Sequence, residues 1–216
     1  MRVPALIRIS AVSAALAASL VACSSLPSVP SQPARYDLGV PPPVQGSQAT
    51  AFPVLALADI QSRTQHDAST AVLYRLAYAD GQALQAYGQA RWSQPPALLV
   101  QQRLREILGQ GRTVLSAESG AQPPLVKGRP VPVLQLSLEE FSHTFTSADR
   151  SAGVLRLRAT LVEPRRSGDT LLGQQVFAVQ QPAASANAAG GTQALAQAVA
   201  EVGAQLQTWL NGVTPP

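Results

Sequence analysis

The sequence predicts a mixed α/β domain in which a β-sheet is covered by helices. Three segments in the second half of the chain alternate apolar and polar residues, as strands with one wetter face do. Two other segments repeat apolar residues at intervals of three and four, as helices packed on one side do. The order strand, hairpin, helix, strands, helix favours a mixed sheet whose C-terminal strands are antiparallel.

The composition indicates a folded chain with little charge. Of 216 residues, 46% are hydrophobic and 13% are charged, which argues against disorder. The net charge of +4 is small and forms no basic run, so we predict no nucleic-acid binding. The single cysteine excludes an internal disulfide. A metal site would have to use His66, His143 and carboxylates, and we predict none.

The N-terminal segment reads as a signal peptide. Residues 1–22 carry Arg2 and Arg8, and the uncharged apolar stretch after them is too short to span a bilayer permanently. Leu20-Val21-Ala22-Cys23-Ser24 then has the form of a bacterial lipobox. We therefore predict removal of residues 1–22 and lipidation of Cys23, the alternative being a chance cysteine after an ordinary signal peptide.

The acylated cysteine would anchor the mature chain in a membrane. Three acyl chains hold firmly, since two already suffice for stable anchoring. Ser24 follows the cysteine in place of the aspartate that marks inner-membrane retention, so we expect the periplasmic face of the outer membrane. Residues 23–34 form a Ser/Pro-rich tether, and the 11 residues after Cys23 reach about 34 Å in polyproline geometry. The folded domain is predicted over residues 35–213.

The first half of that domain should hold short strands, a hairpin and a helix. A possible strand at 35–39 is followed by a proline break, and 52–60 looks like a buried strand. Alternation over 71–79 and the run 82–87 predict a hairpin with a type I′ turn at Asp80-Gly81. Ser93 is a candidate cap for a helix ending at Gly109 or Gly111, and its apolar stripe is Val100, Leu104, Ile107 and Leu108.

The second half should hold the long strands and a C-terminal helix. A short strand is predicted at 113–115 and a loop at 122–132. Three alternating strands follow, marked by Leu134, Leu136 and Leu138, by Leu155, Leu157, Ala159 and Leu161, and by Phe177 and Val179. After a loop over 183–191, a helix over 192–210 carries the stripe Leu195, Val199, Val202, Leu206, Trp209 and Leu210.

The search for catalytic chemistry predicts no catalytic residue and no cofactor. The chain lacks a nucleophile-elbow motif, a zinc-protease motif and a phosphate-binding glycine loop. His66, in a polar loop, and His143, at a strand end, have no recognisable partner motif. Glu139 and Glu140 should point to opposite faces of a strand unless a bulge intervenes.

Four other side chains have a structural and a binding interpretation. Arg156 and Arg158 share a strand face, where they can contact acidic surfaces or lipid headgroups, or simply be solvated. Trp92 and Trp209 are expected in the core or at its edge rather than stacked on a ligand. The C-terminal helix lacks Lys and Arg on its polar face, so packing on the sheet is favoured over lying on a membrane.

Several short segments, in order, resemble the ABC-type transport auxiliary lipoprotein family of the PqiC type. The segments are Ala22-Cys23-Ser24-Ser25, Arg35-Tyr36-Asp37-Leu38-Gly39, Leu73-Tyr74-Arg75-Leu76 and Arg91-Trp92-Ser93-Gln94-Pro95-Pro96, followed by the alternating strands and the alanine-rich helix. The resemblance covers essentially the whole mature chain. It implies a three-layer α/β domain with a mixed sheet, similar to the N-terminal domain of TolB. Only Cys23 is carried over as a functional residue.

The resemblance also implies a role. Such proteins work with an MCE-type lipid-transfer system, whose parts include an MCE-domain periplasmic protein and an ABC permease. The chain would be a non-enzymatic docking component that connects the lipid conduit to the outer membrane. Three rivals remain open: an envelope-integrity or outer-membrane assembly lipoprotein with another partner, a lipid-binding carrier, and a periplasmic hydrolase using His66 or His143.

Overall fold

A computed structural model of the chain describes residues 32–40, 52–62, 69–118 and 122–213. The predicted signal peptide, Cys23 and His66 lie outside these ranges. The described residues from Pro33 onward belong to one compact unit, Pro33–Pro216. No helix within the described ranges combines the length and apolar character needed to cross a membrane.

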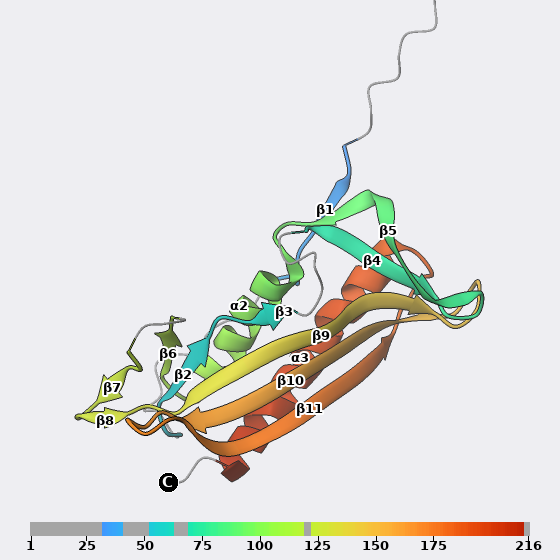
Figure 1. The fold of residues 1–216 in the computed structure, drawn as a ribbon. Coiled ribbons are helices and arrows are strands. Elements are labelled where there is room, and N and C mark those ends of the chain that lie inside the picture. Colours follow the sequence, from blue (N-terminus) through green and yellow to red (C-terminus); the bar gives the residue numbers. More distant parts are fainter. Residues whose placement is uncertain (1–31, 41–51, 63–68, 119–121, 214–216) are drawn as a thin grey trace, which may run out of the picture. The chain divides into compact units, whose positions relative to one another are not determined.

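The main sheet is mixed, as the sequence predicts, and its path runs β1-β5-β4-β9-β10-β11 (Figure 1). Strands β9, β10 and β11 are antiparallel neighbours, whereas β1 runs parallel to β5 and β4 runs parallel to β9. The strands are β1 (Ala34–Tyr36), β2 (Leu55–Ala58), β3 (Gln61–Ser62), β4 (Ala71–Leu76), β5 (Asp80–Trp92), β6 (Val114–Ala117), β9 (Val133–Phe145), β10 (Ser151–Glu163) and β11 (Thr170–Pro182).

Strand β9 joins the two halves of the sheet. Along one edge it pairs with β10 for most of its length. Along its other edge it pairs in succession with β2 at Val133–Leu134, with β3 at Ser137–Leu138 and with β4 at His143–Phe145. The sheet therefore depends on β9 for its connection to every element that precedes it in sequence.

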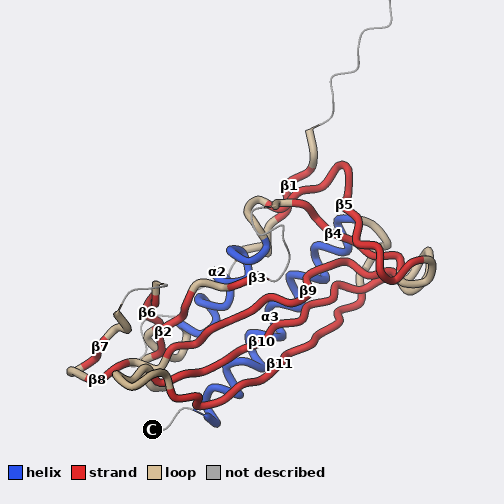
Figure 2. Tube along the Cα trace, viewed as in Figure 1, coloured by secondary structure: helices blue, strands red, loops and turns tan. Residues whose placement is uncertain are grey.

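Two helices lie on the same face of this sheet (Figure 2). They are α2 (Pro96–Gly109) and α3 (Ala188–Val213), and they touch where the α-carbon of Gly203 faces Ile107. Their buried stripes join the inward side chains of β9, β10 and β11 in one hydrophobic core. The described residues thus form two layers, a mixed sheet as predicted and the helices on one of its faces, and the third layer implied by the resemblance is not among them.

Both predicted apolar stripes are buried in this core. Val100, Leu104 and Leu108 are fully buried on α2. On α3, Leu195, Val199, Val202, Leu206 and Leu210 are buried, and Trp209 is half-buried against Phe177. Trp92 is a core residue that packs on Phe141, as expected.

Three local predictions are wrong. The hairpin between β4 and β5 exists, but it turns at 77–79, and Asp80 starts β5 by accepting hydrogen bonds from the backbone of Gln82 and Ala83. Ser93 does not cap α2, because its hydroxyl donates to Asp37. Helix α3 begins at Ala188, inside the predicted loop, because Asn187 accepts the backbone N–H of Gly190 and so caps the earlier turn.

The loop predicted at 122–132 contains a small hairpin. Strands β7 (Leu125–Val126) and β8 (Arg129–Pro130) pair with each other only. Lys127 and Gly128 both have positive φ, of 50° and 76°, which is the geometry of a type I′ turn.

Gly153 of β10 lies where α3 comes closest to the sheet. A β-carbon there would stand 2.6 Å from the backbone nitrogen of Leu195 and 2.7 Å from the carbonyl carbon of Ala194. Because these are backbone atoms, the helix itself would have to shift. We expect Gly153→Ala to lower the free energy of unfolding by about 1–3 kcal/mol, measured by denaturant titration.

Gly88 of β5 is the matched control. A β-carbon at Gly88 meets nothing within 4 Å. Gly88→Ala should therefore leave stability unchanged or raise it slightly. Equal effects of the two substitutions would contradict the close approach of α3 to β10.

Candidate functional site: the open face of the sheet

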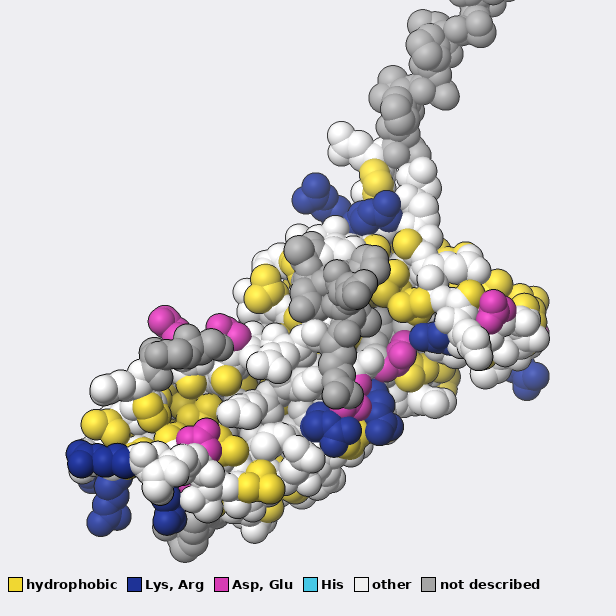
Figure 3. Space-filling view, viewed as in Figure 1, with side chains coloured by type: hydrophobic (Ala, Val, Ile, Leu, Met, Phe, Trp, Pro, Cys, Tyr) yellow, Lys and Arg dark blue, Asp and Glu magenta, His cyan; other side chains and the backbone are white. Residues whose placement is uncertain are grey.

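The face of β9, β10 and β11 that points away from the helices is the candidate site, called here the open face. Helices α2 and α3 lie on the other side of these strands (Figure 1). In the space-filling view, basic and acidic side chains lie next to each other over the long strands rather than in separate patches (Figure 3). Its polar side chains in β9, β10 and β11 are Gln135, Ser137, Glu139, Glu140, Ser142, Thr144, Arg156, Arg158, Thr160, Gln174 and Gln180.

A bulge in β9 places two adjacent carboxylates on this face. Arg156 pairs with Glu140, but the next residue, Leu157, pairs with Leu138, so Glu139 is the extra residue of β9. The side chains of Glu139 and Glu140 both reach arginines of the open face. The sequence predicts that Glu139 and Glu140 point to opposite faces only if the strand is regular. Because β9 has a bulge at this point, that prediction does not apply.

Glu139 is held between two arginines of the neighbouring strand. Its Oε2 accepts from Nε of Arg156 at 2.8 Å, and its Oε1 accepts from Nε of Arg158 at 2.7 Å. The Glu139 side chain is only 10% exposed, whereas Arg156 is 49% exposed. These hydrogen bonds, that of Arg156 above all, hold the pKa of Glu139 below its usual value. The carboxylate therefore stays ionised and positions both guanidinium groups.

Glu140 belongs to a separate pair. Arg75 of β4 approaches its Oε2 at 3.5 Å, and the hydroxyl of Ser142 donates to Glu140. Arg75 also donates to the carbonyl oxygen of Gly81 at 2.8 Å, so the guanidinium ties the hairpin to β9. The two carboxylates thus have different partners and do not share a proton as a catalytic dyad would.

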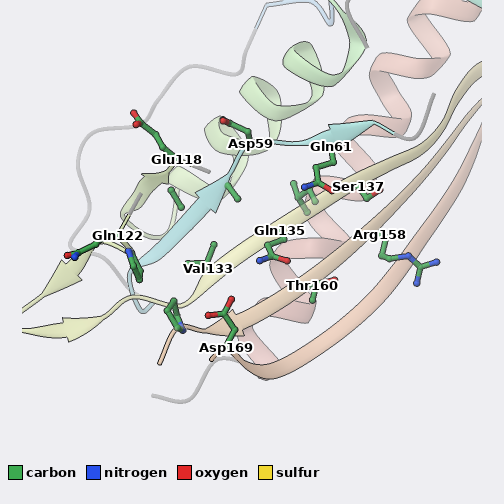
Figure 4. A pocket seen from close by; sticks show the side chains of 15 residues that line it. Asp59, Gln61, Glu118, Gln122, Val133, Gln135, Ser137, Arg158, Thr160 and Asp169 are labelled. Carbon is green, nitrogen blue, oxygen red and sulfur yellow. The ribbon is translucent and has the colours of Figure 1, made fainter. Parts of the chain in front are cut away.

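A hollow of about 470 Å³ lies on the open face next to the Glu139 cluster. Gln135, Ser137 and Thr160 lie on its sheet side, with Arg158 toward the cluster (Figure 4). The rest of the lining is mixed: the acidic residues are Asp59, Glu118 and Asp169, and the apolar ones include Ala58, Ala117 and Val133. Within the described residues, no group of three or more His, Cys, Asp or Glu side chains could hold a metal ion.

His143 is buried, which corrects its interpretation as an ordinary strand-end histidine. The ring lies on the helix side of β9 between Phe145 and Gly191, where a β-carbon on Gly191 would stand 2.3 Å from Nδ1. Nδ1 shares a hydrogen bond of 2.8 Å with the Tyr87 hydroxyl, and the buried Nε2 has no partner. Burial lowers the pKa of His143 to about 4, and burial together with Tyr74 raises the pKa of Tyr87 to about 12. Both groups are therefore neutral near pH 7.

Arg112 is a second buried polar residue, and sequence patterns do not single it out. Its Nη2 donates to Oδ1 of Asn211 at 2.6 Å, and its guanidinium lies over the ring of Phe52 at 5.3 Å. Burial lowers its pKa from the ordinary value. Arg112 links Phe52, which precedes β2, to the end of α3.

The sequence does contain a signal for the bulge. Apolar residues occupy the even positions Leu134, Leu136 and Leu138, and then the odd positions Phe141 and Phe145. Since side chains alternate in a strand, this change of phase requires one extra residue between 138 and 141. The pairing of Glu139 with β10 depends on register and is not visible in the sequence.

The fold and this face define a two-layer α/β domain with one side available for contacts. Residues 36–207 match the model of a family described as ABC-type transport auxiliary lipoprotein component. The chain belongs to this family, which is one of membrane-anchored proteins of the cell envelope that assist ABC-type transport. The resemblance found in the sequence is therefore confirmed. No curated protein matches the sequence.

Solved structures share the fold at low sequence identity. Protein XCC0632 from Xanthomonas campestris is 18% identical and superposes with a TM-score of 0.61, over 82% of this chain and 94% of that one. A second structure, described as an uncharacterized protein, is 14% identical with a TM-score of 0.61, over 83% of this chain and 99% of that one. At these identities the likeness establishes the fold.

His143 should make the domain less stable in acid. Its folded pKa of about 4 lies below the ordinary value of 6.5, so the unfolded chain binds a proton at a higher pH than the folded chain does. The contribution of neutral His143 to the free energy of unfolding is fully present above about pH 6.5. It is lost as the pH falls through about 4, and the loss amounts to up to about 3 kcal/mol. We expect denaturant titrations between pH 7 and pH 4 to show this loss in the wild type.

The matched variants are His143→Gln and Tyr87→Phe. Glutamine does not titrate, so His143→Gln should flatten the pH dependence in this window, whatever its effect at pH 7. Tyr87→Phe leaves the histidine buried and should keep the slope. A slope unchanged by His143→Gln would contradict the assignment.

Proposed function

We propose that this chain is a lipid-anchored, non-catalytic auxiliary subunit of an MCE-type ABC lipid-transport system. In this proposal Cys23 is acylated and residues 23–34 tether the domain to the periplasmic face of the outer membrane. The domain docks on the MCE-domain protein and helps to connect its conduit to that membrane. Membership of the transport auxiliary family supports the association with an ABC system. We propose in addition that the partner is an MCE-domain protein with its permease and that the membrane is the outer membrane.

The open face is the observation that carries the docking role. Half-exposed arginines are held in fixed positions by a carboxylate that is itself nearly buried. Such preorganised guanidinium groups lose little freedom on binding and suit carboxylates of a protein partner. The tether would keep this face at high effective concentration near one membrane.

The same contacts favour a non-catalytic role. A general base needs access to a substrate proton and a pKa near the working pH. His143 has a buried ring, and burial lowers its pKa to about 4. Glu139 and Glu140 are each engaged with arginine.

A lipid-carrier role is less well supported. The hollow on the open face mixes polar and charged side chains with apolar ones, whereas acyl chains require a predominantly apolar lining. Mass spectrometry of the purified protein tests this alternative, because a carrier should retain stoichiometric phospholipid. The envelope-assembly alternative is tested by the identity of co-purified partners.

The first test is a tagged pull-down from gently solubilised membranes, comparing wild type with Cys23→Ser. We expect the wild type to recover an MCE-domain protein and its permease. Cys23→Ser removes the acylation site, so it should reduce this recovery several-fold and shift the protein out of the outer-membrane fraction. Reproducible recovery of envelope assembly proteins in their place would contradict the proposal.

The second test reverses the charge of the open face. Arg156→Glu should weaken binding to the MCE-domain protein at least tenfold, because it places a second carboxylate beside Glu139 and removes a positioned cation. Arg165→Glu is the control, since Arg165 lies in the loop after β10 and pairs with Glu163. Affinities measured by surface plasmon resonance that fall equally for both variants would argue against docking through the open face.

A further inference from the structure

The outer edge of β11 is an unprotected strand edge. Strand β11 ends the sheet order, and within the described residues no strand pairs with its outer side. It is 13 residues long and very regular, with one irregularity near its start, where Leu161 pairs with Gly173 and Val162 with Leu171. An edge of this kind presents a row of free backbone N–H and C=O groups to another strand.

The central part of the edge, from Gly173 to Gln181, carries little of the usual protection against pairing. In natural proteins, charged side chains, prolines, bulges or covering segments prevent an edge strand from pairing with another chain. No residue from Leu171 to Gln181 is charged, and the only proline, Pro182, stands at the very end. The opposite end of the sheet is different, because β5 is covered there by β1.

The sequence of this edge is nearly symmetric. Residues 174–181 read Gln-Gln-Val-Phe-Ala-Val-Gln-Gln, with four apolar residues between two pairs of glutamines. A two-fold axis places each strand against its own reversed sequence, so apolar residues must meet apolar ones and any charge would oppose a like charge. That symmetry is centred between Phe177 and Ala178, whereas a register centred on Phe177 keeps Val176 opposite Ala178 and Gln174 opposite Gln180 and places Gln175 opposite Val179. No charge opposes another in either case.

We propose that β11 pairs with β11 of a second copy of this chain, antiparallel and about a two-fold axis perpendicular to the sheet. Paired residues of an antiparallel ladder share a face, so the two numbers of a pair must have the same parity. Centring the axis at Phe177 puts Val176 opposite Ala178 of the second copy and Gln174 opposite Gln180. The two six-stranded paths then form one continuous sheet with both open faces on the same side.

The burial of these side chains in the single chain bears on what each face contributes to the pairing. Phe177 and Val179 are already buried under α3, and Trp209 covers Gly173 and Phe177 from the same helix. Ala178 is exposed and Val176 half-buried on the open face, so their meeting would bury small apolar groups beside the new backbone hydrogen bonds. The dimer would present two copies of the Arg156–Glu139–Arg158 cluster to a partner. The pairing itself does not rest on the proposed function.

Self-association of the full acylated chain, in excess detergent, is the first test. We expect analytical ultracentrifugation to show a reversible dimer in the micromolar range. Ala178→Lys places two like charges in the ladder and should raise the dissociation constant at least tenfold. Leu98→Lys is the control, because Leu98 is a 48% exposed apolar residue on α2, and it should dimerise as the wild type does.

Disulfide trapping tests the register. Two differently tagged chains, Val176→Cys and Ala178→Cys, are co-expressed and oxidised in membranes. We expect the mixed disulfide to form at least fivefold faster than between Val154→Cys and Ala178→Cys, since Val154 lies on β10, away from the edge. Wild type, treated in the same way, controls for any disulfide through Cys23.

Three results would overturn the pairing. The first is a wild-type chain that stays monomeric at about 100 μM. The second is a dimer that Ala178→Lys leaves intact. The third is a mixed disulfide that forms no faster than the disulfide of the Val154 control. Each is separable from failure of the proposed function, because a protein that dimerises through β11 and recovers no MCE-domain protein would support this inference alone.

Discussion

A single extra residue in β9 organises the domain. Side chains of a strand alternate between faces, so a regular strand of this sequence would send Phe141 and Phe145 to the opposite side from Leu134, Leu136 and Leu138. The bulge at Glu139 restores the phase, so that Phe141 and Phe145 face the helices together with Leu134, Leu136 and Leu138, and the buried His143 is the polar exception. The same residue divides the other edge of β9 between β3 and β4. Core, sheet connectivity and open face all depend on it.

The bulge also concentrates charge where it can be used. It turns Glu139 toward Arg156 and Arg158, and it leaves Glu140 to Arg75. Partly exposed ion pairs contribute little to stability, so this network is poorly explained as a device for folding. Its more evident effect is to hold guanidinium groups rigidly on the one face of the sheet that no helix covers. This arrangement suits a binding surface better than a reaction centre.

The two edges of the sheet differ in whether another strand covers them. At one end, the short parallel strand β1 covers β5, and Ser93 binds Asp37 just beyond it. The other end stops at β11, which is uncharged and nearly symmetric in sequence. A family defined by an auxiliary role in transport works through contacts, and the open face and this edge offer separate surfaces for a partner and for a second copy.

The sequence alone determined the elements whose apolar pattern is strong. The long strands and both helices follow from alternation and helical spacing, because burial against one layer selects those periods. The family resemblance rests on four short segments in order, followed by the alternating strands and the alanine-rich helix, and the match over residues 36–207 confirms it. Local signals were less reliable: Asp80-Gly81 and Ser93 have the residue types of a turn and a cap, but Asp80 begins a strand and Ser93 binds Asp37.

Only the tertiary structure decided which faces meet and which stay free. His143 has the sequence setting of a surface residue, yet the approach of Gly191 buries it, since long-range packing decides solvent access. The placement of both helices on one side, the position of Glu139 between two arginines and the free edge of β11 are likewise matters of register and strand order. Pairings between segments distant in the chain set these features, and no local pattern of residues encodes them.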